Sequence, residues 1–433
     1  MFRKCLLVFI IALLFTPLLE QYTNIIHLHP LKGVTLPTTK NDPGLSFSSW
    51  FSADYQNYKE EVLSDSCGFR SIFIRINNQI DYSLFNQTHA QNVILGKDGY
   101  FFANVYIYGH YGTDFIGRTE IDQITDKLAF IRDTLAKLGK TLILVVTPNK
   151  ADFYSQFIPD ENVAKQGPTN YGTYMEFVKK KRLNCIDFNQ FFLDNKNRAK
   201  YPLYSQHGTH WSMYGAALAG DSLIKYIEKV RNIQMPHAIW KDIEIADPKD
   251  FDIDIEEFLN LVFDLKSWKM AYPKIEFPKN TPLTKPNVLV VGDSYYWGLV
   301  SGYDIYNAFS PTSNFWYYNN SVYPESSAKK TVVGDLNLKE QIAKHDVIII
   351  LATAHNYGTL GWGFINNTYN MFKGAASTQL DTTYKRKLTD MRNRIKDDAD
   401  WFKQVTEKAQ KKGVPVDSML TLDAIWVIEQ QKK

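Results

Sequence analysis

The sequence is poor in cysteine and contains none of the common zinc motifs. Only three cysteines occur among 433 residues, without a C-x-x-C pair or an H-E-x-x-H motif. Of the nine histidines, only His207 and His210 stand at a spacing that metal ligands use. We therefore expect no structural or catalytic zinc and no other cofactor. The net charge is only +3 and the basic residues are scattered, which argues against nucleic acid as a partner.

The N-terminus does contain a long apolar run. Residues 1–21, MFRKCLLVFIIALLFTPLLEQ, begin with Arg3 and Lys4 and continue with apolar side chains from Cys5 to Phe15. This pattern is typical of a secretory signal, and because no A-x-A cleavage site follows, it indicates either a signal peptide or an uncleaved signal anchor. We expect the rest of the chain to be exported, either periplasmic or anchored to the membrane. In an oxidising compartment, Cys67 and Cys185 would form a disulfide or remain two buried thiols.

The remaining sequence predicts an α/β fold with a mainly parallel sheet flanked by helices. Residues 22–45 are rich in proline and turn residues and indicate a linker, and the stretch 46–85 is helical in pattern. A hairpin is expected around Lys97-Asp98-Gly99. Continuous apolar strands such as TLILVV, NVLVV and DVIIILA then alternate with amphipathic helices, as in doubly wound folds. We expect 232–283 to be an irregular or helical connection and 376–433 to be a charged helical tail.

The stretch SQHGTHWSMYGA places His210 in the loop just before an amphipathic helix that Ser212 can cap. A histidine in such a loop is held still and can be exposed, as a general base requires. It can equally well be a capping or packing residue.

Two predicted strand ends also carry polar residues suited to catalysis. In VLVVGDSYYWG, Gly292 permits a tight turn that presents the Ser294 hydroxyl at the carboxyl edge of the sheet, near helix-start amides. In IIILATAHNYG, Asn356 follows a buried strand and could supply another oxyanion donor. The alternatives are a Gly-Asp-Ser turn without catalytic function and an ordinary turn asparagine.

Taken together, these motifs resemble the SGNH hydrolase family. Their order, with His210 before Ser294 before Asn356, is similar to the SGNH-like domain of the alginate O-acetyltransferase (AlgJ/AlgX-like) group. GFRSIFIRINNQIDYSLF, VILGKDGYFF and LVVTPNKADFYSQFIP also resemble segments of that group. The resemblance covers residues 46–375, which it implies form an SGNH-like O-acyltransferase domain with permuted motifs.

The resemblance implies that Ser294 is the nucleophile and His210 the base in acetyl transfer onto an exported polysaccharide or cell-surface glycan. It further implies a membrane-embedded acyltransferase that supplies the acetyl groups. The alternatives are a carbohydrate acetyl-esterase with the same site and a non-catalytic glycan-binding or assembly protein.

The candidate substrate-binding residues are Trp297, Tyr295, Lys150 and His207. Each of these also has an alternative: the rings of Trp297 and Tyr295 can pack the helix, Lys150 can be an exposed lysine at a strand end, and His207 can be a surface residue.

The sequence departs from the group at Gly208, where the group carries an aspartate two residues before the histidine. That carboxylate would fix the imidazole tautomer. Without it, a backbone carbonyl or another side chain must orient His210, or the site is degenerate. We expect Gly208→Asp to leave activity equal or higher if the backbone there does not need positive φ.

Overall fold

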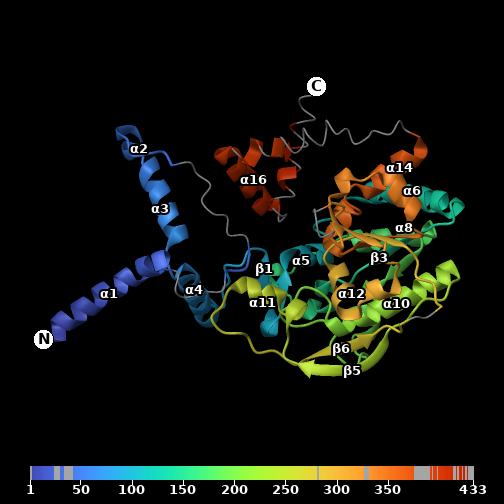
Figure 1. The fold of residues 1–433 in the computed structure, drawn as a ribbon, viewed down its shortest axis with the longest axis horizontal. Coiled ribbons are helices and arrows are strands. Elements are labelled where there is room, and N and C mark those ends of the chain that lie inside the picture. Colours follow the sequence, from blue (N-terminus) through green and yellow to red (C-terminus); the bar gives the residue numbers. More distant parts are fainter. Residues whose placement is uncertain are drawn as a thin grey trace. The chain divides into compact units, whose positions relative to one another are not determined.

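A computed structural model describes residues 2–23, 30–33, 42–279, 282–325, 331–374 and much of 391–427. The chain forms two compact units (Figure 1). The first comprises residues 1–91, 256–266 and 394–404. The second comprises 92–255, 267–393 and 405–433, and it contains every residue predicted for the site.

The second unit is built on a six-stranded sheet with the order β4-β3-β10-β7-β8-β9. All neighbouring strands are parallel except β9, which runs antiparallel to β8. The fold class predicted from the sequence is therefore confirmed. The strands are β3 (Thr141–Val146), β4 (Cys185–Asp187), β7 (Val288–Gly292), β8 (Asn314–Tyr317), β9 (Ser321–Tyr323) and β10 (Val347–Ala352).

Helices cover both faces of this sheet. Alternate residues of β3 point to opposite sides, so that Ile143 and Val145 join one hydrophobic core while Leu142 and Leu144 join the other. The helices are α5 (Asn104–Tyr111), α6 (Arg118–Lys137), α7 (Lys150–Phe153), α8 (Asn170–Lys180), α9 (Phe188–Asn195), α10 (Met213–Arg231), α12 (Tyr295–Tyr303), α13 (Leu338–Lys344) and α14 (Phe364–Lys373).

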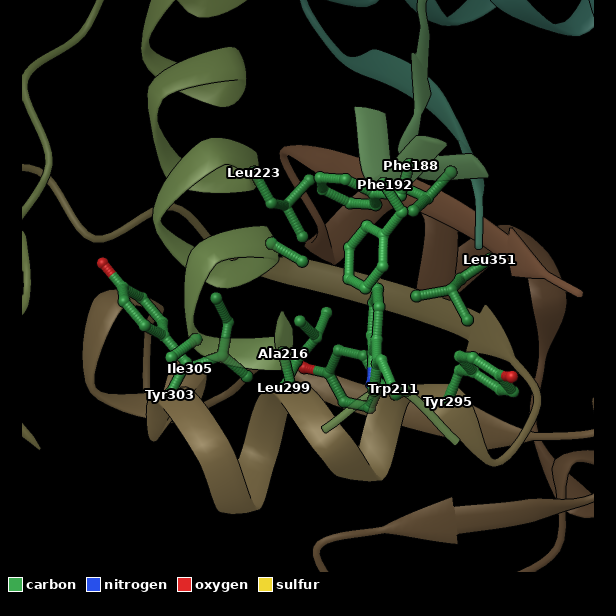
Figure 2. Close-up of a cluster of buried hydrophobic side chains, with 14 of the residues drawn as sticks. Phe188, Phe192, Trp211, Ala216, Leu223, Tyr295, Leu299, Tyr303, Ile305 and Leu351 are labelled. Carbon is green, nitrogen blue, oxygen red and sulfur yellow. The ribbon is translucent and has the colours of Figure 1, made fainter. Parts of the chain in front are cut away.

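Helices α10 and α12 follow the predicted histidine and serine motifs, and they pack closely against each other. Figure 2 shows Ala216 and Leu223 of α10 in one apolar cluster with Tyr295 and Leu299 of α12. At Gly220, a Cβ atom would lie only 2.4 Å from the Tyr303 ring, which explains the absence of a side chain there. The packing of α10 against α12 fixes the positions of the two motifs relative to each other.

The predicted connection 232–283 contains more regular structure than its sequence pattern indicates. Strands β5 (Ile239–Ala246) and β6 (Met270–Glu276) form an antiparallel pair, which the expectation of an irregular or helical segment missed. Between them lie a short 3-10 turn, η4 (Asp250–Asp252), and helix α11 (Asp254–Leu259). Every residue of β5 is partly or fully exposed. Its sequence therefore does not need the continuous apolar run that identified the central strands.

Other predicted elements are present with small shifts in their bounds. The hairpin consists of β1 (Val93–Leu95) and β2 (Phe101–Ala103) with η1 (Lys97–Gly99) between them. Short 3-10 turns occur at η2 (Ser155–Phe157), η3 (Asp160–Asn162), η5 (Ile305–Ala308), η6 (Val333–Asp335) and η7 (Ala354–Thr359). In the predicted tail, α16 (Ala399–Lys412) is helical, whereas residues 375–390 lie outside the described residues.

The first unit holds the apolar N-terminal helix α1 (Phe2–Thr23), together with α2 (Phe47–Phe51), α3 (Asp54–Ser66) and α4 (Arg70–Phe85). Its segment Lys4–Thr23 is long and apolar enough to cross a membrane. Cys67 lies in this unit and Cys185 in the second unit, and both are half-buried free thiols. Most of the predicted linker 22–45 lies outside the described residues.

Candidate active site

The structure brings Ser294 and His210 into direct contact. Ser294 follows β7 and occupies the N-cap position of α12, and His210 precedes the start of α10. The His210 Nε2 and Ser294 Oγ atoms are 2.8 Å apart, a hydrogen-bond distance. Ser212 caps α10, as predicted, because its side chain accepts a hydrogen bond from the backbone N–H of Gly215.

A third residue, Asp254, completes this arrangement, and the sequence analysis missed it. Its Oδ2 atom lies 2.5 Å from His210 Nδ1, and its Oδ1 atom accepts a hydrogen bond from the backbone N–H of Thr209 at 2.6 Å. Since a carboxylate only accepts, His210 carries its proton on Nδ1 and turns the Nε2 lone pair toward the Ser294 hydroxyl. A serine, a histidine and an aspartate are therefore linked in one chain of hydrogen bonds, the arrangement that an activated serine nucleophile requires.

Asp254 occupies the role left open by Gly208, and the local geometry explains the exchange. A Cβ atom at position 208 would lie 2.2 Å from the Phe251 carbonyl oxygen and 2.6 Å from Ser205 Oγ. The chain that carries Asp254 therefore passes through the space that a side chain at 208 would need. An aspartate at 208 and this path of residues 251–254 exclude each other.

The structure consequently reverses the expectation for Gly208→Asp. We expect this variant to lose at least tenfold in activity and to melt at a lower temperature, because residues 251–254 must move and take Asp254 away from His210. Activity and thermal melting should be compared with Gly167→Ala, whose Cβ would meet only the Tyr111 carbonyl oxygen, at 3.4 Å. Wild-type activity in Gly208→Asp would show that residues 251–254 accommodate a side chain at position 208 without moving Asp254 away from His210.

Asp293 and Asn356 lie beside the nucleophile and order its turn. Asp293 is fully buried, and its Oδ2 atom accepts hydrogen bonds from the backbone N–H and the hydroxyl of Thr353, each at 2.7 Å. Asn356 donates its Nδ2 hydrogens to Asp293 Oδ2 at 2.9 Å and to Thr353 Oγ1 at 3.2 Å. The two acceptors lie 2.7 Å from each other, so one amide hydrogen of Asn356 faces both, and the expected role of Asn356 as an oxyanion donor stays a prediction. These bonds tie the end of β7 to the end of β10.

Two of the predicted substrate contacts are buried packing residues instead. Tyr295 is fully buried, with its hydroxyl donating to the Thr209 carbonyl oxygen at 2.8 Å and its ring centroid 4.8 Å from that of His210. His207 is buried and stacks on Phe101 with ring centroids 4.7 Å apart. Both side chains support the loop of His210, and neither is placed to contact a sugar. Trp297, the other predicted stacking residue, is half-buried.

Lys150 is also a buried supporting residue, not a lysine lining an open surface. Its side chain is fully buried, and its Nζ atom donates to the carbonyl oxygens of Gln206 and Gly208 at 2.8 and 2.6 Å. Burial lowers the pKa of Lys150 to about 7. The lysine thereby holds the part of the loop directly before Thr209 and His210, the two residues that Asp254 contacts.

A second buried carboxyl group, Asp252, should make stability depend on pH. Burial raises its pKa from 3.8 to about 7, and the nearby Asp254 and Asp250 act in the same direction. The folded protein therefore keeps this proton between pH 4 and 7 while the unfolded chain releases it, so stability falls as pH rises through that window.

We expect Asp252→Asn, which mimics the protonated group, to raise the free energy of unfolding at pH 8 by a few kcal/mol. The gain should vanish near pH 4, where the wild-type carboxyl group is protonated in the folded chain. Urea denaturation at both pH values measures this difference. A gain of equal size at both values would contradict the assignment of the titration to Asp252.

Ser294, His210 and Asp254 thus form one hydrogen-bonded chain beside the carboxyl end of β7, a geometry that is compatible with acyl transfer. Residues 93–297, which include all three linked side chains, match the family model described as the SGNH hydrolase-like domain of acetyltransferase AlgX. The resemblance inferred from the motifs is thus confirmed for this segment.

Two curated relatives are each described as a probable alginate O-acetylase AlgJ. The protein from Pseudomonas putida is 23% identical over 150 residues, which are 35% of this chain and 37% of the relative. The protein from Pseudomonas syringae pv. tomato is 28% identical over 147 residues, which are 33% and 35% of the two chains. The chain therefore spans little more than a third of the length of the curated relatives that it matches.

Similar solved structures include the O-acetyltransferase domain of Pseudomonas putida AlgJ, with a TM-score of 0.43 and 18% identity over 65% of this chain and 99% of that one. Another is Pseudomonas aeruginosa AlgX, with a TM-score of 0.42 and 11% identity over 65% and 67% of the two chains.

Proposed function

We propose that the protein is an O-acetyltransferase that acts on an exported polysaccharide or cell-surface glycan through Ser294, His210 and Asp254. The observation that carries this proposal is the continuous hydrogen-bonded chain from Asp254 through His210 to Ser294. The family match over 93–297 and the relatives named as alginate O-acetylases support the choice of acetyl group and glycan.

The reaction follows from this geometry in two steps. In the first step, Ser294 Oγ attacks the carbonyl carbon of an acetyl donor while its proton passes to His210 Nε2 and then to the leaving group. In the second step, a sugar hydroxyl gives its proton to His210 Nε2 and its oxygen attacks the acetyl carbon. The bond between the acetyl carbon and Ser294 Oγ then breaks, and Nε2 returns the proton to Ser294 Oγ. Asp254 stabilises the imidazolium that forms in each step.

The oxyanion of each tetrahedral intermediate needs a donor, and the backbone N–H of Ser294 is the candidate. Within the described part of the chain this N–H has no acceptor, whereas the N–H of Tyr295 is engaged by Asp293 Oδ1 at 3.1 Å. Asp293 and Asn356 fix the turn that aims the Ser294 N–H, so we assign them positioning roles.

The partners that we propose are a polysaccharide acceptor and a membrane-embedded acyltransferase that supplies acetyl groups. An exported location, either periplasmic or anchored by the N-terminal segment, fits these partners and the apolar helix α1. The organisation that we propose is a leader at 1–21, a linker at 22–45, an SGNH-like domain at 46–375 and a helical tail at 376–433.

The test is a fluorogenic acetyl-ester assay on the full chain, with and without purified polysaccharide. We expect release of the fluorophore to depend on Ser294 and the acetyl group to appear on the polysaccharide. Release with acetate as the sole product would instead identify a carbohydrate esterase. If wild type and Ser294→Ala behave alike, a non-catalytic glycan-binding protein becomes the better description.

Export makes a separate prediction. A reporter that is active only outside the cytoplasm, fused after residue 40, should be active because Arg3, Lys4 and the following apolar run direct the chain across the membrane. The control replaces Leu7 and Leu14 by Asp, which should reduce reporter activity at least tenfold. Reporter activity that is equally low in both fusions would contradict export.

A further inference from the structure

Five half-buried aromatic side chains form a continuous series of ring contacts, which we call the aromatic row: Trp297, Tyr323, Tyr317, Tyr318 and Trp362. Ring centroids are 4.8 Å apart between Trp297 and Tyr323, and 6.4 Å apart between Tyr323 and Tyr317. The row continues from Tyr317 to Tyr318 at 4.5 Å and from Tyr318 to Trp362 at 5.1 Å. None of the five residues is fully buried.

The row lies beside the nucleophile. Trp297 is three residues beyond Ser294 in the first turn of α12, and the backbone N–H of Tyr318 donates to the Gly292 carbonyl oxygen at 2.9 Å. Gly292 ends β7, directly before the Asp293–Ser294 turn. Tyr317 ends the neighbouring strand β8, so Tyr317 and Tyr318 lie at the carboxyl edge of the sheet, whereas Tyr323 pairs with Phe315 two residues further back.

Two residues of the row are held in a backbone conformation that large side chains rarely adopt. Tyr318 has φ of +50° and Trp362 has φ of +45°. The segments that carry them are joined, because Asn319 Nδ2 donates to the Trp362 carbonyl oxygen at 2.9 Å. Such conformations cost about 1–3 kcal/mol each and concentrate at functional sites. Core packing alone would not require a bulky ring at a position where glycine or asparagine is less strained.

We propose that the aromatic row is a binding subsite for sugar rings of the acceptor glycan, with Tyr318 and Trp362 as its main contacts. This inference rests on the proposed function and adds the location of the acceptor chain. Aromatic faces provide flat apolar contact for the C–H faces of sugar rings, and tyrosine hydroxyls provide hydrogen bonds to their hydroxyl groups. A row of several rings suits an extended chain of sugars, of which one unit would lie at Ser294.

The test measures glycan binding directly, in a Ser294→Ala background that prevents turnover. Tyr318→Asn and Trp362→Asn remove the rings while keeping a residue that tolerates positive φ. The control is Phe69→Asn, since Phe69 is a half-buried aromatic residue with φ of +63° in the other compact unit. The probes are short oligosaccharides of alginate, which is acidic, and of cellulose, which is neutral, titrated by calorimetry.

We expect Tyr318→Asn and Trp362→Asn each to raise the Kd of at least one oligosaccharide by about 3- to 10-fold, with Phe69→Asn unchanged. Trp362→Phe, which retains a ring, should fall between Trp362→Asn and wild type. With Ser294 restored, the control Phe69→Asn should hydrolyse the small fluorogenic ester at the wild-type rate. Unchanged Kd values in both Asn variants, or no binding of either glycan to wild type, would overturn the subsite. If the wild-type protein does not hydrolyse the ester at all, that result counts against the proposed function but not against the glycan-binding subsite.

Discussion

Ser294→Ala is expected to lower the rate of acetyl transfer by about 10⁴-fold or more, and His210→Ala should lower it to a similar extent. The two atoms that exchange the proton are 2.8 Å apart, and neither group works without the other. Removing both side chains should therefore cost little more than removing one. Initial rates of fluorogenic ester hydrolysis and of acetyl transfer to polysaccharide measure the effect.

Matched controls separate this loss from misfolding. Ser301→Ala changes an exposed serine on the same helix, α12, and His89→Ala removes an exposed histidine of the first unit. Both should keep nearly full activity. A residual rate in Ser294→Ala or His210→Ala within tenfold of the wild-type rate would rule out the pair as nucleophile and base.

Asp254→Asn should produce the second largest effect, a loss of about 10³- to 10⁴-fold with little change in melting temperature. An asparagine amide can donate to His210 Nδ1, which would favour the tautomer that places the proton on Nε2. That proton would then face Ser294 Oγ, and His210 could no longer act as a base. Asp250→Asn is the control, because Asp250 lies in the same loop, is exposed and has φ of +55°, which asparagine tolerates.

The double variant Gly208→Asp/Asp254→Asn extends this argument. A carboxylate at 208 has no room while the Phe251 carbonyl oxygen occupies that space, so we expect no recovery of activity over Asp254→Asn. Recovery would mean that residues 251–254 adjust easily and that the family position for the carboxylate remains usable in this chain.

The sequence sufficed for the elements whose signals are local. The continuous apolar run of β7 followed by Gly-Asp-Ser identified the strand and the turn of Ser294, and Ser212 marked the start of α10. Because the carboxyl ends of parallel strands meet at one edge, the motifs of Ser294 and Asn356, which follow β7 and β10, could be expected to lie close together. The ring contacts of the aromatic row could not be predicted, since they depend on the pairing of β7 with β8.

Asp254 could not be singled out in the same way. It lies 44 residues after His210 in DPKDFDIDIEE, where several acidic residues alternate without a motif that marks one of them. The available signal was indirect: a missing carboxylate at Gly208 and an acid-rich connection further along the chain. The contact of Asp254 with the His210 imidazole and the burial of Asp252 depend on how residues 249–254 are folded in three dimensions.

The misassigned residues share a physical reason. Lys150, His207 and Tyr295 all stand next to strand ends or motif residues, where polar and aromatic side chains are commonly exposed. Lys150 and Tyr295 are buried because the loop of residues 206–209 covers them. The carbonyl oxygens of residues 206 and 208 accept hydrogen bonds from Lys150 Nζ, and the Thr209 carbonyl oxygen accepts one from the Tyr295 hydroxyl. Burial by a distant segment leaves no trace in local sequence periodicity.

The most direct test of the central claim is mass spectrometry of the protein after rapid quenching with an acetyl donor. We expect one acetyl group on the peptide that contains Ser294, and we expect a polysaccharide acceptor to accelerate its loss. Ser294→Ala should show no acetyl group there, and Asp254→Asn should acquire it far more slowly than wild type. An acetyl group that accumulates on another residue, or turnover without any acetylated protein, would contradict the account.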